Sequence, residues 1–358
     1  MAKIKALVVD DSAYNRTVIS QMLASDEGID VVGSAVDGVD AIAKTLRLLP
    51  DVITLDLEMP NMDGFTFLRW LMKERPTPVL VLSSRSDSRS VFRALELGAV
   101  DFLAKPEVRI SKSIESIRDD LVAKVHAILN LEMAKVKSTI DLLARPQEPP
   151  VVRKEDEARQ EAGPYAVVAI AASTGGPPAL QAILTALPAD LSAGIVISQH
   201  MPPGFTRSFA ERLNKLSPLL VSEAAEGDRV EPGTALIAPG GYHLLVKKDR
   251  SGLGIELAPR GPADKYVPSA DRMMVSVAEA CGPAVLGVVL TGMGRDGVEG
   301  VLAIKSRRGQ CLAESETSAV IFGMPQEAIR SGAVDKVVPL DKMAGEIIAR
   351  CSSARSTL

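Results

Sequence analysis

The sequence predicts an α/β protein with two domains, and three observations lead to this prediction. Short apolar runs alternate with helical patterns over residues 1–109, as in a doubly wound parallel sheet of five strands. A second set of such runs and patterns begins near residue 164. Residues 145–161 between them hold three prolines and nine charged residues, so we expect an exposed connector there. At 358 residues the chain is long enough for both domains.

Four apolar runs in the first domain end in side chains suited to a phosphoryl group or a metal ion. The runs, each with the residues that follow it, are 3–9 with Asp10 and Asp11, 52–55 with Asp56, 78–82 with Ser83, and 100–104 with Lys105. The carboxyl ends of parallel strands meet at one crevice, so these side chains are expected to converge there. A pocket of this kind suits Mg²⁺. Each acid taken alone could be an unrelated loop residue, but the matched positions favour a pocket.

The helical patterns of the first domain fall between these runs. Ser12 is placed to cap the first helix. Further helices are expected at residues 39–48, 65–72 and 89–97, and a long one at residues 111–143. The first half of the long helix should pack on the sheet, and its second half should extend into a linker. We place the domains at residues 1–125 and 164–350, with a helical and then charged linker at residues 126–163.

The second domain is predicted to be α/β, with a mainly parallel sheet and a β-rich antiparallel portion. Buried strands are expected at residues 166–171, 193–198 and 284–290. Helices are expected at residues 178–187, 205–216, 269–281 and 298–306. Residues 219–257 are rich in short strands and turns, which indicates the antiparallel portion.

A serine lies in the turn between the first strand and the first helix of this domain. Ser173 is flanked by small residues in the segment AASTGGP, residues 171–177. Such a turn can expose a nucleophilic hydroxyl, although the match to the G-x-S-x-G elbow is imperfect. A glycine-rich turn before a helix can instead bind phosphate. The chain lacks the P-loop lysine and the G-x-G-x-x-G pattern at this turn, so a nucleophile is the favoured interpretation.

A nucleophilic serine needs a base, and the chain contains three histidines. His126 lies on the linker helix, and His243 opens a strand and is expected to be structural. His200 follows the second strand and should reach the same crevice as Ser173, although it could be a loop residue bonded to backbone. Asp296 follows the third strand and could orient the histidine or simply cap a helix. Together the three predict a Ser173–His200–Asp296 triad.

Composition limits the partners and the location. The net charge is −4 and aromatic residues make up 3% of the chain, so nucleic acid is not an expected partner. The three cysteines show no C-x-x-C spacing, which favours a reducing compartment over a disulfide framework. No apolar run approaches the roughly 20 residues of a membrane span, and no signal peptide is recognised. We expect a cytoplasmic protein with no membrane insertion, and a monomer.

The acid pocket resembles that of the receiver domain of bacterial response regulators, over residues 1 to about 125. The matching segments are Asp10 and Asp11, residues 56–64 (DLEMPNMDG), Ser83, and Lys105 followed by proline. The resemblance implies that a histidine kinase phosphorylates Asp56, and that Asp10, Asp11 and Asp56 bind Mg²⁺. It also implies that Lys105 senses the phosphoryl group and that Ser83 moves toward it. Phe102 stands where the family often has an aromatic switch residue, although a core phenylalanine is an alternative.

Residues 164–350 resemble the catalytic domain of the protein-glutamate methylesterases of bacterial chemotaxis. The matching segments are STGG at 173–176, QHMPPGF at 199–205, APGG at 238–241, PS at 268–269 and GMGRDG at 292–297. Val267 departs from the pattern, since a basic residue is expected there. The resemblance implies a carboxylic ester hydrolase that cleaves glutamate γ-methyl esters on methyl-accepting chemoreceptors, releases methanol, and deamidates receptor glutamines.

The resemblance assigns roles to the residues around the triad. Ser173 attacks, His200 takes the proton, Asp296 orients His200, and backbone amides near Thr174 and Met293 hold the oxyanion. Mg²⁺ is expected for phosphorylation of the receiver, which should switch the esterase on, and no cofactor is expected for the ester step. Two alternatives remain open, a second domain that only binds a partner and a DNA-binding transcription factor. The second lacks a helix-turn-helix pattern and a basic patch.

Overall fold

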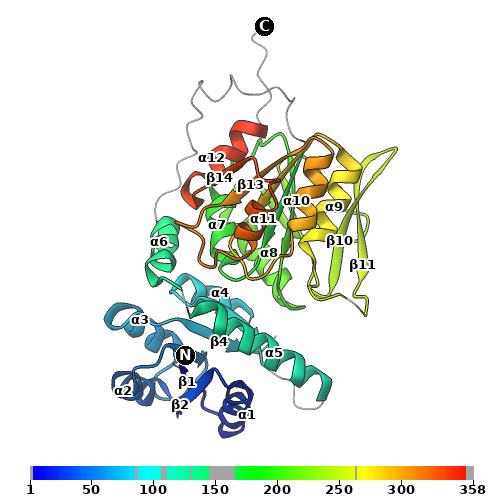
Figure 1. Cartoon of the computed structure of the whole chain (residues 1–358). Coiled ribbons are helices and arrows are strands. Elements are labelled where there is room, and N and C mark those ends of the chain that lie inside the picture. Colours follow the sequence, from blue (N-terminus) through cyan, green and yellow to red (C-terminus); the bar gives the residue numbers. More distant parts are fainter. Residues whose placement is uncertain are drawn as a thin grey trace. The chain divides into compact units, whose positions relative to one another are not determined.

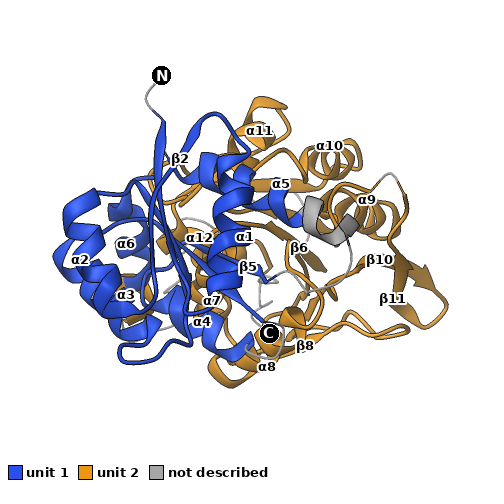
Figure 2. Cartoon of the chain, turned by 90° about the horizontal axis from the view of Figure 1, so that it is seen from below, with its two compact units in different colours: residues 1–140 blue, residues 141–358 orange. Residues whose placement is uncertain are grey.

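The chain forms two compact units, residues 1–140 and residues 141–358, which are coloured separately in Figure 2. The computed structural model describes residues 3–84, 88–105, 111–129, 131–144, 166–262 and 264–351, with the backbone alone for residues 111–116. Of the helical and then charged linker predicted at residues 126–163, the charged stretch at residues 145–161 lies outside the described residues. Each unit is described by itself below.

The first unit contains a five-stranded sheet in the order β2-β1-β3-β4-β5, in which every pair is parallel. Its strands are β1 (Ile4–Val9), β2 (Ile29–Ala35), β3 (Val52–Asp56), β4 (Val79–Ser83) and β5 (Asp101–Ala104). Its helices are α1 (Ala13–Ala24), α2 (Gly38–Leu48), α3 (Gly64–Glu74), α4 (Ser88–Glu96), α5 (Ser111–Ile128) and α6 (Met133–Ala144), the last crossing the unit boundary. The predicted doubly wound sheet is confirmed.

Short polar side chains fix where the first helices of this unit begin. The Ser12 hydroxyl accepts a hydrogen bond from the amide of Asn15, and Asp37 caps α2 in the same way. Asp63 caps α3 by accepting from the amide of Thr66. Such caps satisfy amides that have no partner within the helix. They set the helix starts just after the carboxyl ends of the strands, where the acid pocket lies.

The prediction of one long helix at residues 111–143 is wrong, because the chain forms two helices there. The amide of Leu129 donates to the His126 carbonyl, and that of Leu131 to the Ile128 carbonyl. These bonds span three residues rather than four, so the last turn of α5 tightens and the α-helical pattern stops. A new helix, α6, begins at Met133. Apolar periodicity continues through this break, and periodicity alone therefore could not reveal it.

The second unit contains a seven-stranded parallel sheet in the order β14-β13-β12-β6-β7-β9-β8. Its strands are β6 (Val167–Ala172), β7 (Gly194–Gln199), β8 (Leu220–Glu223), β9 (Thr234–Ile237), β12 (Val285–Val289), β13 (Gln310–Glu314) and β14 (Lys336–Val338). Its helices are α7 (Gly176–Ala186), α8 (Phe205–Leu216), α9 (Ala270–Cys281), α10 (Val298–Ser306), α11 (Met324–Arg330) and α12 (Leu340–Cys351). The α/β prediction for this part is confirmed.

The predicted antiparallel portion is a hairpin beside the parallel sheet. Strands β10 (Tyr242–Asp249) and β11 (Gly252–Pro259) pair with the register Tyr242↔Pro259. The hairpin lies next to α9, and α9 lies beside α10 (Figure 1). Residues 220–223 and 234–237 form β8 and β9 of the parallel sheet instead, so only the later part of the predicted region is antiparallel.

Burial on both faces explains the apolar character of the central strand. All six residues of β6 are buried. Alternate residues of β6 join one hydrophobic cluster with Met273 and Met274 of α9, while α7 also packs against this strand. A strand covered on both faces reads as a continuous apolar run rather than an alternating one. In the sheet order β6 lies between β12 and β7, and the chain runs from β6 to β7 but from β12 to β13, in opposite directions along the sheet. The carboxyl ends of strands at such a reversal are where open α/β sheets generally bind ligands.

Candidate functional site

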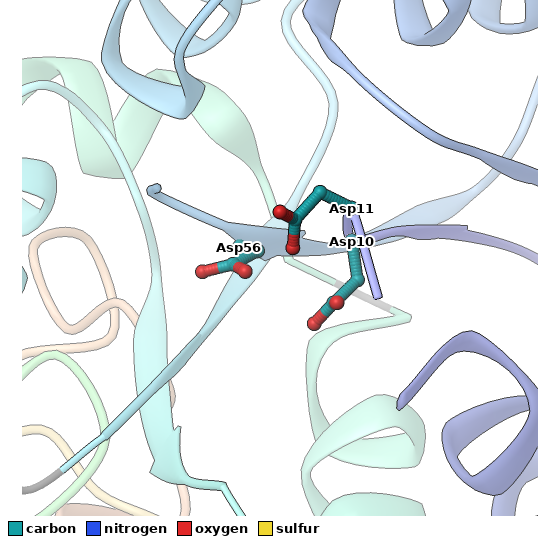
Figure 3. A group of neighbouring side chains, drawn as sticks. All are labelled: Asp10, Asp11 and Asp56. Carbon is teal, nitrogen blue, oxygen red and sulfur yellow. The ribbon is translucent and has the colours of Figure 1, made fainter. Parts of the chain in front are cut away.

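Three carboxylates gather at the carboxyl ends of β1 and β3 in the first unit. Oxygen atoms of Asp10, Asp11 and Asp56 lie within 4.8 Å of one another (Figure 3). Asp10 and Asp56 are buried, whereas Asp11 is exposed. A set made only of carboxylate oxygens matches the ligands that Mg²⁺ prefers. The predicted convergence is therefore present, and the donor set fits the metal.

Lys105 bridges two of these carboxylates. Its Nζ lies 2.6 Å from Oδ2 of Asp56 and 3.1 Å from Oδ2 of Asp10. Burial raises the pKa of Asp56, and the hydrogen bond and charge of Lys105 offset part of that effect. Burial lowers the pKa of Lys105, but the two carboxylates outweigh it and raise the pKa above its usual value. The ammonium thus stabilises the ionised form of Asp56, which is the form that can attack a phosphoryl donor.

A glycine allows the loop after β3 to close over Asp56. A Cβ at Gly64 would lie 2.3 Å from the Asp56 carbonyl oxygen and 2.7 Å from Cα of Leu57. The Gly64 amide donates to the Leu57 carbonyl at 3.0 Å. Any side chain at this position would push the start of α3 away from the strand. The segment after Asp56 therefore depends on glycine for packing.

The structure places the remaining receiver residues around this pocket. Ser83 ends β4, is buried, and donates through Oγ to the Ser84 carbonyl at 3.2 Å. The Lys105 amide donates to the Ser83 carbonyl at 2.8 Å, which joins the ends of β4 and β5. Phe102 is buried and packs edge-on against Phe92, with ring centroids 6.4 Å apart. This is a core environment, and a switch role for Phe102 stays a prediction. The proline after Lys105 lies outside the described residues.

In the second unit, three side chains form a hydrogen-bonded chain at the ends of neighbouring strands. Ser173 follows β6, His200 follows β7 and Asp296 comes after β12. His200 Nδ1 lies 3.2 Å from Ser173 Oγ, and His200 Nε2 lies 2.7 Å from Oδ2 of Asp296. With its proton on Nε2, the imidazole would present a free lone pair at Nδ1 to the serine hydroxyl. The structure thus brings together the three predicted residues.

Several donors surround the carboxylate of Asp296. Its Oδ1 accepts from Ser269 Oγ at 2.9 Å and from the Asp271 amide at 3.0 Å. Its Oδ2 accepts from the Ala270 amide at 2.7 Å as well as facing His200. Burial raises the pKa of Asp296, but the hydrogen bond with His200, followed by those from the Asp271 and Ala270 amides, outweighs it and lowers the pKa to about 2. The start of α9 thus holds an ionised carboxylate behind His200.

Glycines bring the turn after β6 close to the loop after β12. A Cβ at Gly292 would lie 2.8 Å from Ser173 Cβ and 2.4 Å from Met324 Sδ. Gly175 has φ of +77°, in the left-handed region that favours glycine. A Cβ at Gly176 would lie 2.0 Å from Oε1 of Gln199, whose amide nitrogen donates to the Ser173 carbonyl. The small residues that marked this turn in the sequence are therefore required by close packing.

Backbone amides near Ser173 differ in whether they can bind an oxyanion. The Ser173 amide donates to the Thr291 carbonyl at 3.0 Å and is therefore occupied. The Thr174 carbonyl accepts from Thr291 Oγ1 at 2.9 Å, which orients the peptide that follows Thr174. Within residues 166–262 and 264–351, the Met293 amide has no protein acceptor. Met293 lies one residue after Gly292, which packs against Ser173, so the predicted role of its amide in binding an oxyanion stays a prediction.

The other histidines and one tyrosine occupy distinct environments. His126 pairs with Asp26 at 3.0 Å in the first unit. His243 is buried, accepts from the Ser269 amide at 3.2 Å and contacts Asp264 at 2.8 Å, as a structural histidine would. Tyr266 stacks on the ring of His200. Sequence analysis missed Tyr266 as part of the site, because a tyrosine in a loop carries no motif.

A second acid that sequence analysis missed supports Asp296 indirectly. Asp271 accepts through Oδ1 from the amides of Gly297 and Gly300, at 2.8 and 2.9 Å. Burial, together with the nearby charge of Asp296, raises the pKa of Asp271. Asp271 thereby joins α9 to the start of α10, which follows directly on Asp296. Its place in the first turn of α9, two residues after the capping Ser269, was the available sequence signal.

A third missed acid lies beneath the loop after β12. Glu314 ends β13 and is fully buried. Its Oε2 accepts from the Thr291 amide at 2.8 Å, and its Oε1 accepts from Ser318 Oγ at 2.9 Å. Burial raises its pKa to about 7, and these two hydrogen bonds offset only part of the effect. Glu314 therefore anchors Thr291, which in turn contacts Ser173 and Thr174.

The two units together define a class of protein. One polypeptide carries an acid pocket of receiver type, followed by an α/β domain with a hydrogen-bonded serine–histidine–aspartate chain. Residues 6–117 match the family model of the response regulator receiver domain. Residues 168–347, half of the chain, match the model of the CheB methylesterase.

Relatives of known name extend this similarity over nearly the whole chain. A protein-glutamate methylesterase/protein-glutamine glutaminase of Geobacter sulfurreducens is 52% identical over 98% of this chain and 98% of its own length. One from Myxococcus xanthus is 46% identical over 97% and 96%. The crystal structure of the Thermotoga maritima CheB methylesterase catalytic domain matches 52% of this chain and 98% of its own, with 39% identity and a TM-score of 0.50.

The chain therefore belongs to the CheB methylesterase family and carries a response regulator receiver domain at its N-terminal end. The methylesterase match occupies the region where a transcription factor would need its DNA-binding domain, so that alternative is not supported. Among the described helices, none is both long and apolar enough to cross a membrane.

Replacing Glu314 with glutamine is expected to change how stability depends on pH. The pKa of Glu314 rises from 4.5 to about 7 on folding, so the folded state keeps a proton that the unfolded state releases. The free energy of unfolding therefore falls as the pH rises from 4.5 to about 7. Above this range the loss reaches its full size of roughly 3 kcal/mol. Glu314→Gln retains an acceptor for Thr291 without this cost.

The measurement is the free energy of opening from hydrogen exchange in β12 and β13, at about pH 5 and about pH 8.5. We expect wild type to lose roughly 3 kcal/mol relative to Glu314→Gln over this interval. Glu316→Gln, two residues along and outside β13, is the matched control and should follow wild type. An identical pH dependence in wild type and Glu314→Gln would contradict the raised pKa.

Proposed function

We propose that this protein hydrolyses γ-methyl esters of glutamate on methyl-accepting chemoreceptors, releasing methanol, and that phosphorylation of its receiver activates the reaction. The single observation that carries the proposal is the hydrogen-bonded chain from Ser173 through His200 to Asp296. Relatives named protein-glutamate methylesterase/protein-glutamine glutaminase support the choice of substrate. The resulting carboxylates would reset receptor signalling, which is sensory adaptation in a two-component pathway.

In this proposal Ser173 is the nucleophile and His200 the general base. His200 Nδ1, 3.2 Å from Ser173 Oγ, takes the hydroxyl proton as the oxygen attacks the ester carbonyl. The imidazolium that forms is stabilised by Asp296, which faces Nε2 at 2.7 Å. His200 then returns the proton to the leaving methoxide, which departs as methanol. Water attacks the acyl-serine by the same route and releases the glutamate carboxylate.

We assign the oxyanion to the backbone amides of Thr174 and Met293. The Met293 amide has no protein acceptor among the described residues, and Gly292 keeps its loop against Ser173. Thr291, two residues before Met293, also holds the turn that contains Ser173 and Thr174. Its hydroxyl donates to the Thr174 carbonyl, and its carbonyl accepts from the Ser173 amide. Loss of one such donor typically costs about 100- to 1,000-fold in rate.

The same site is suited to deamidation of glutamine side chains. A γ-carboxamide differs from a γ-methyl ester only in its leaving group, so attack by Ser173 leads to the same acyl-enzyme. The proton on His200 would then go to the departing nitrogen, and ammonia would replace methanol as the product. The glutaminase named in the relatives supports this second activity.

In the receiver, Asp56 is proposed to accept a phosphoryl group from a histidine kinase. Asp10, Asp11 and Asp56 would hold Mg²⁺, whose charge offsets that of the incoming phosphoryl oxygens. Lys105, now bonded to Asp56, would contact the phosphoryl group, and Ser83 and Phe102 would respond to it. The acyl phosphate would carry a charge of about −1.5 to −2 in place of the single negative charge of the Asp56 carboxylate. That change is the proposed signal that activates the esterase.

Replacing Asp296 with asparagine tests the triad. The amide cannot stabilise the imidazolium and favours the wrong tautomer of His200, so kcat should fall by about 10⁴-fold. The measurement is methanol release from methylated chemoreceptor membranes. Asp249→Asn, at an exposed position on β10, is the matched control and should keep the wild-type rate. A kcat for Asp296→Asn within tenfold of wild type would refute the assigned role.

Replacing Asp56 with asparagine tests the switch. Asparagine cannot form the acyl phosphate, so a small phosphodonor with Mg²⁺ should no longer stimulate methanol release, while the basal rate should stay close to that of wild type. Asp40→Asn on α2, with a half-buried side chain outside the acid pocket, is the control and should remain stimulated. Undiminished stimulation of Asp56→Asn would show that phosphorylation at this residue is not the activating event.

A further inference from the structure

We propose that Tyr266 is a positioning residue for His200, and that its ring sets the orientation of the imidazole and stabilises the imidazolium formed during catalysis. This inference rests on the proposed function of Ser173, His200 and Asp296 and adds a residue to that site. Tyr266 lies in the segment between β11 and α9, which is separate in sequence from the glycine-rich loops that carry the triad.

The two rings form a close and nearly parallel stack. Their centroids are 4.6 Å apart and their planes differ by 6°. This separation is at the short end of the range for aromatic pairs. Tyr266 is half-buried, and its ring covers one face of the His200 ring. Water is thereby kept from that face of the imidazole.

The hydrogen bonds of His200 leave its ring free to tilt, and the stacked Tyr266 ring restricts this motion. Ser173 and Asp296 hydrogen-bond to Nδ1 and Nε2, and the hydrogen-bonding directions of these two nitrogens lie in the plane of an imidazole. They fix where the nitrogens point, but they resist tilting of the ring out of its plane only weakly. A parallel aromatic face resists that tilt directly. Small errors in the position of a base cost large factors in rate, so this restraint has a kinetic effect.

Tyr266 also contacts the loop proposed to bind the oxyanion. A Cβ at Gly294 would lie 2.7 Å from the Tyr266 hydroxyl oxygen, and φ of Gly294 is +90°. The glycine therefore makes room for the end of the tyrosine ring. Met293, whose amide we assign to the oxyanion, immediately precedes this glycine. One side chain thus packs against both the base and the oxyanion loop.

The ring also affects the charge that His200 acquires. The face of an aromatic ring attracts a cation, and the attraction is stronger where the pair is shielded from water. His200 is neutral before it takes the proton of Ser173 and positive afterwards, so the attraction favours the transition state over the resting state. Asp296 lies at Nε2, and Lys265 lies with Nζ 5.1 Å from the Tyr266 centroid. Tyr266→Phe keeps the ring that Lys265 contacts, so this variant leaves both charged groups with their present partners.

The test compares Tyr266→Phe, which keeps the ring, with Tyr266→Leu and Tyr266→Met, which remove it. Methanol release from methylated chemoreceptor membranes by the full chain gives kcat, KM and the pH dependence. We expect the Phe variant to stay within about twofold of wild type, and the two aliphatic variants to lose about tenfold in kcat with KM changed less than about threefold. The pH of half-maximal activity on the acid side should fall by about half a unit in these variants. Tyr242→Leu, at an exposed tyrosine on β10, is the control.

Several results would overturn the proposal. One is a kcat within twofold of wild type in both aliphatic variants, with an unmoved acid limb. Another is an equal loss in Tyr266→Phe, which would assign the effect to the hydroxyl. If both aliphatic variants lose their fold, the proton signals of the His200 ring in wild type and Tyr266→Phe decide, because stacking predicts an upfield ring-current shift in both. Ser173→Ala and His200→Gln run in parallel separate the two claims, since full activity in these would refute the triad itself.

Discussion

The parallel pairing of β6 with β12 on one side and β7 on the other is the constraint on which the second unit depends. The registers Ala171↔Val289 and Ala172↔Gln199 bring the carboxyl ends of three strands level. Residues 27 and 96 positions apart in the chain thereby come within hydrogen-bonding distance. The glycines at 175, 176 and 292 then allow the connecting loops to approach without side chains between them. Chemistry at this edge is a consequence of strand order.

Buried charge is handled in the same way in both units. Asp56 is paired with Lys105, and Asp296 is surrounded by Ser269, backbone amides and His200. Each carboxylate is kept close to donors that stabilise its ionised form against the cost of burial. Glu314 differs in its partners, because only neutral donors face it and burial raises its pKa to about 7, whereas at Asp56 the Lys105 ammonium offsets part of the rise. The proposed roles of Asp56 and Asp296 require an ionised carboxylate. Glu314 anchors a loop, and ionising it would only lower the stability of the fold.

Site residues that directly follow apolar runs could be predicted from the sequence. Site residues that reach the triad from other loops or strands could not. Ser173, His200 and Asp296 each follow a buried strand, so sheet geometry alone predicted their convergence. Tyr266 reaches His200 from a loop whose path depends on packing, and no local pattern records that path. Glu314 ends a strand as the triad residues do, but nothing in the sequence shows that its partner is the Thr291 amide. The break between α5 and α6 was hidden because the apolar stripe runs through it.

The most direct test of the central claim is methanol release from methylated chemoreceptor membranes by the full chain and by Ser173→Ala, each with and without a small phosphodonor and Mg²⁺. We expect release by wild type to rise with the phosphodonor, and release by Ser173→Ala to stay at background in both conditions. Release by Ser173→Ala at the wild-type rate would contradict the account, because another group would then have to be the nucleophile. Folded wild type that accepts phosphate but releases no methanol would contradict the proposed substrate.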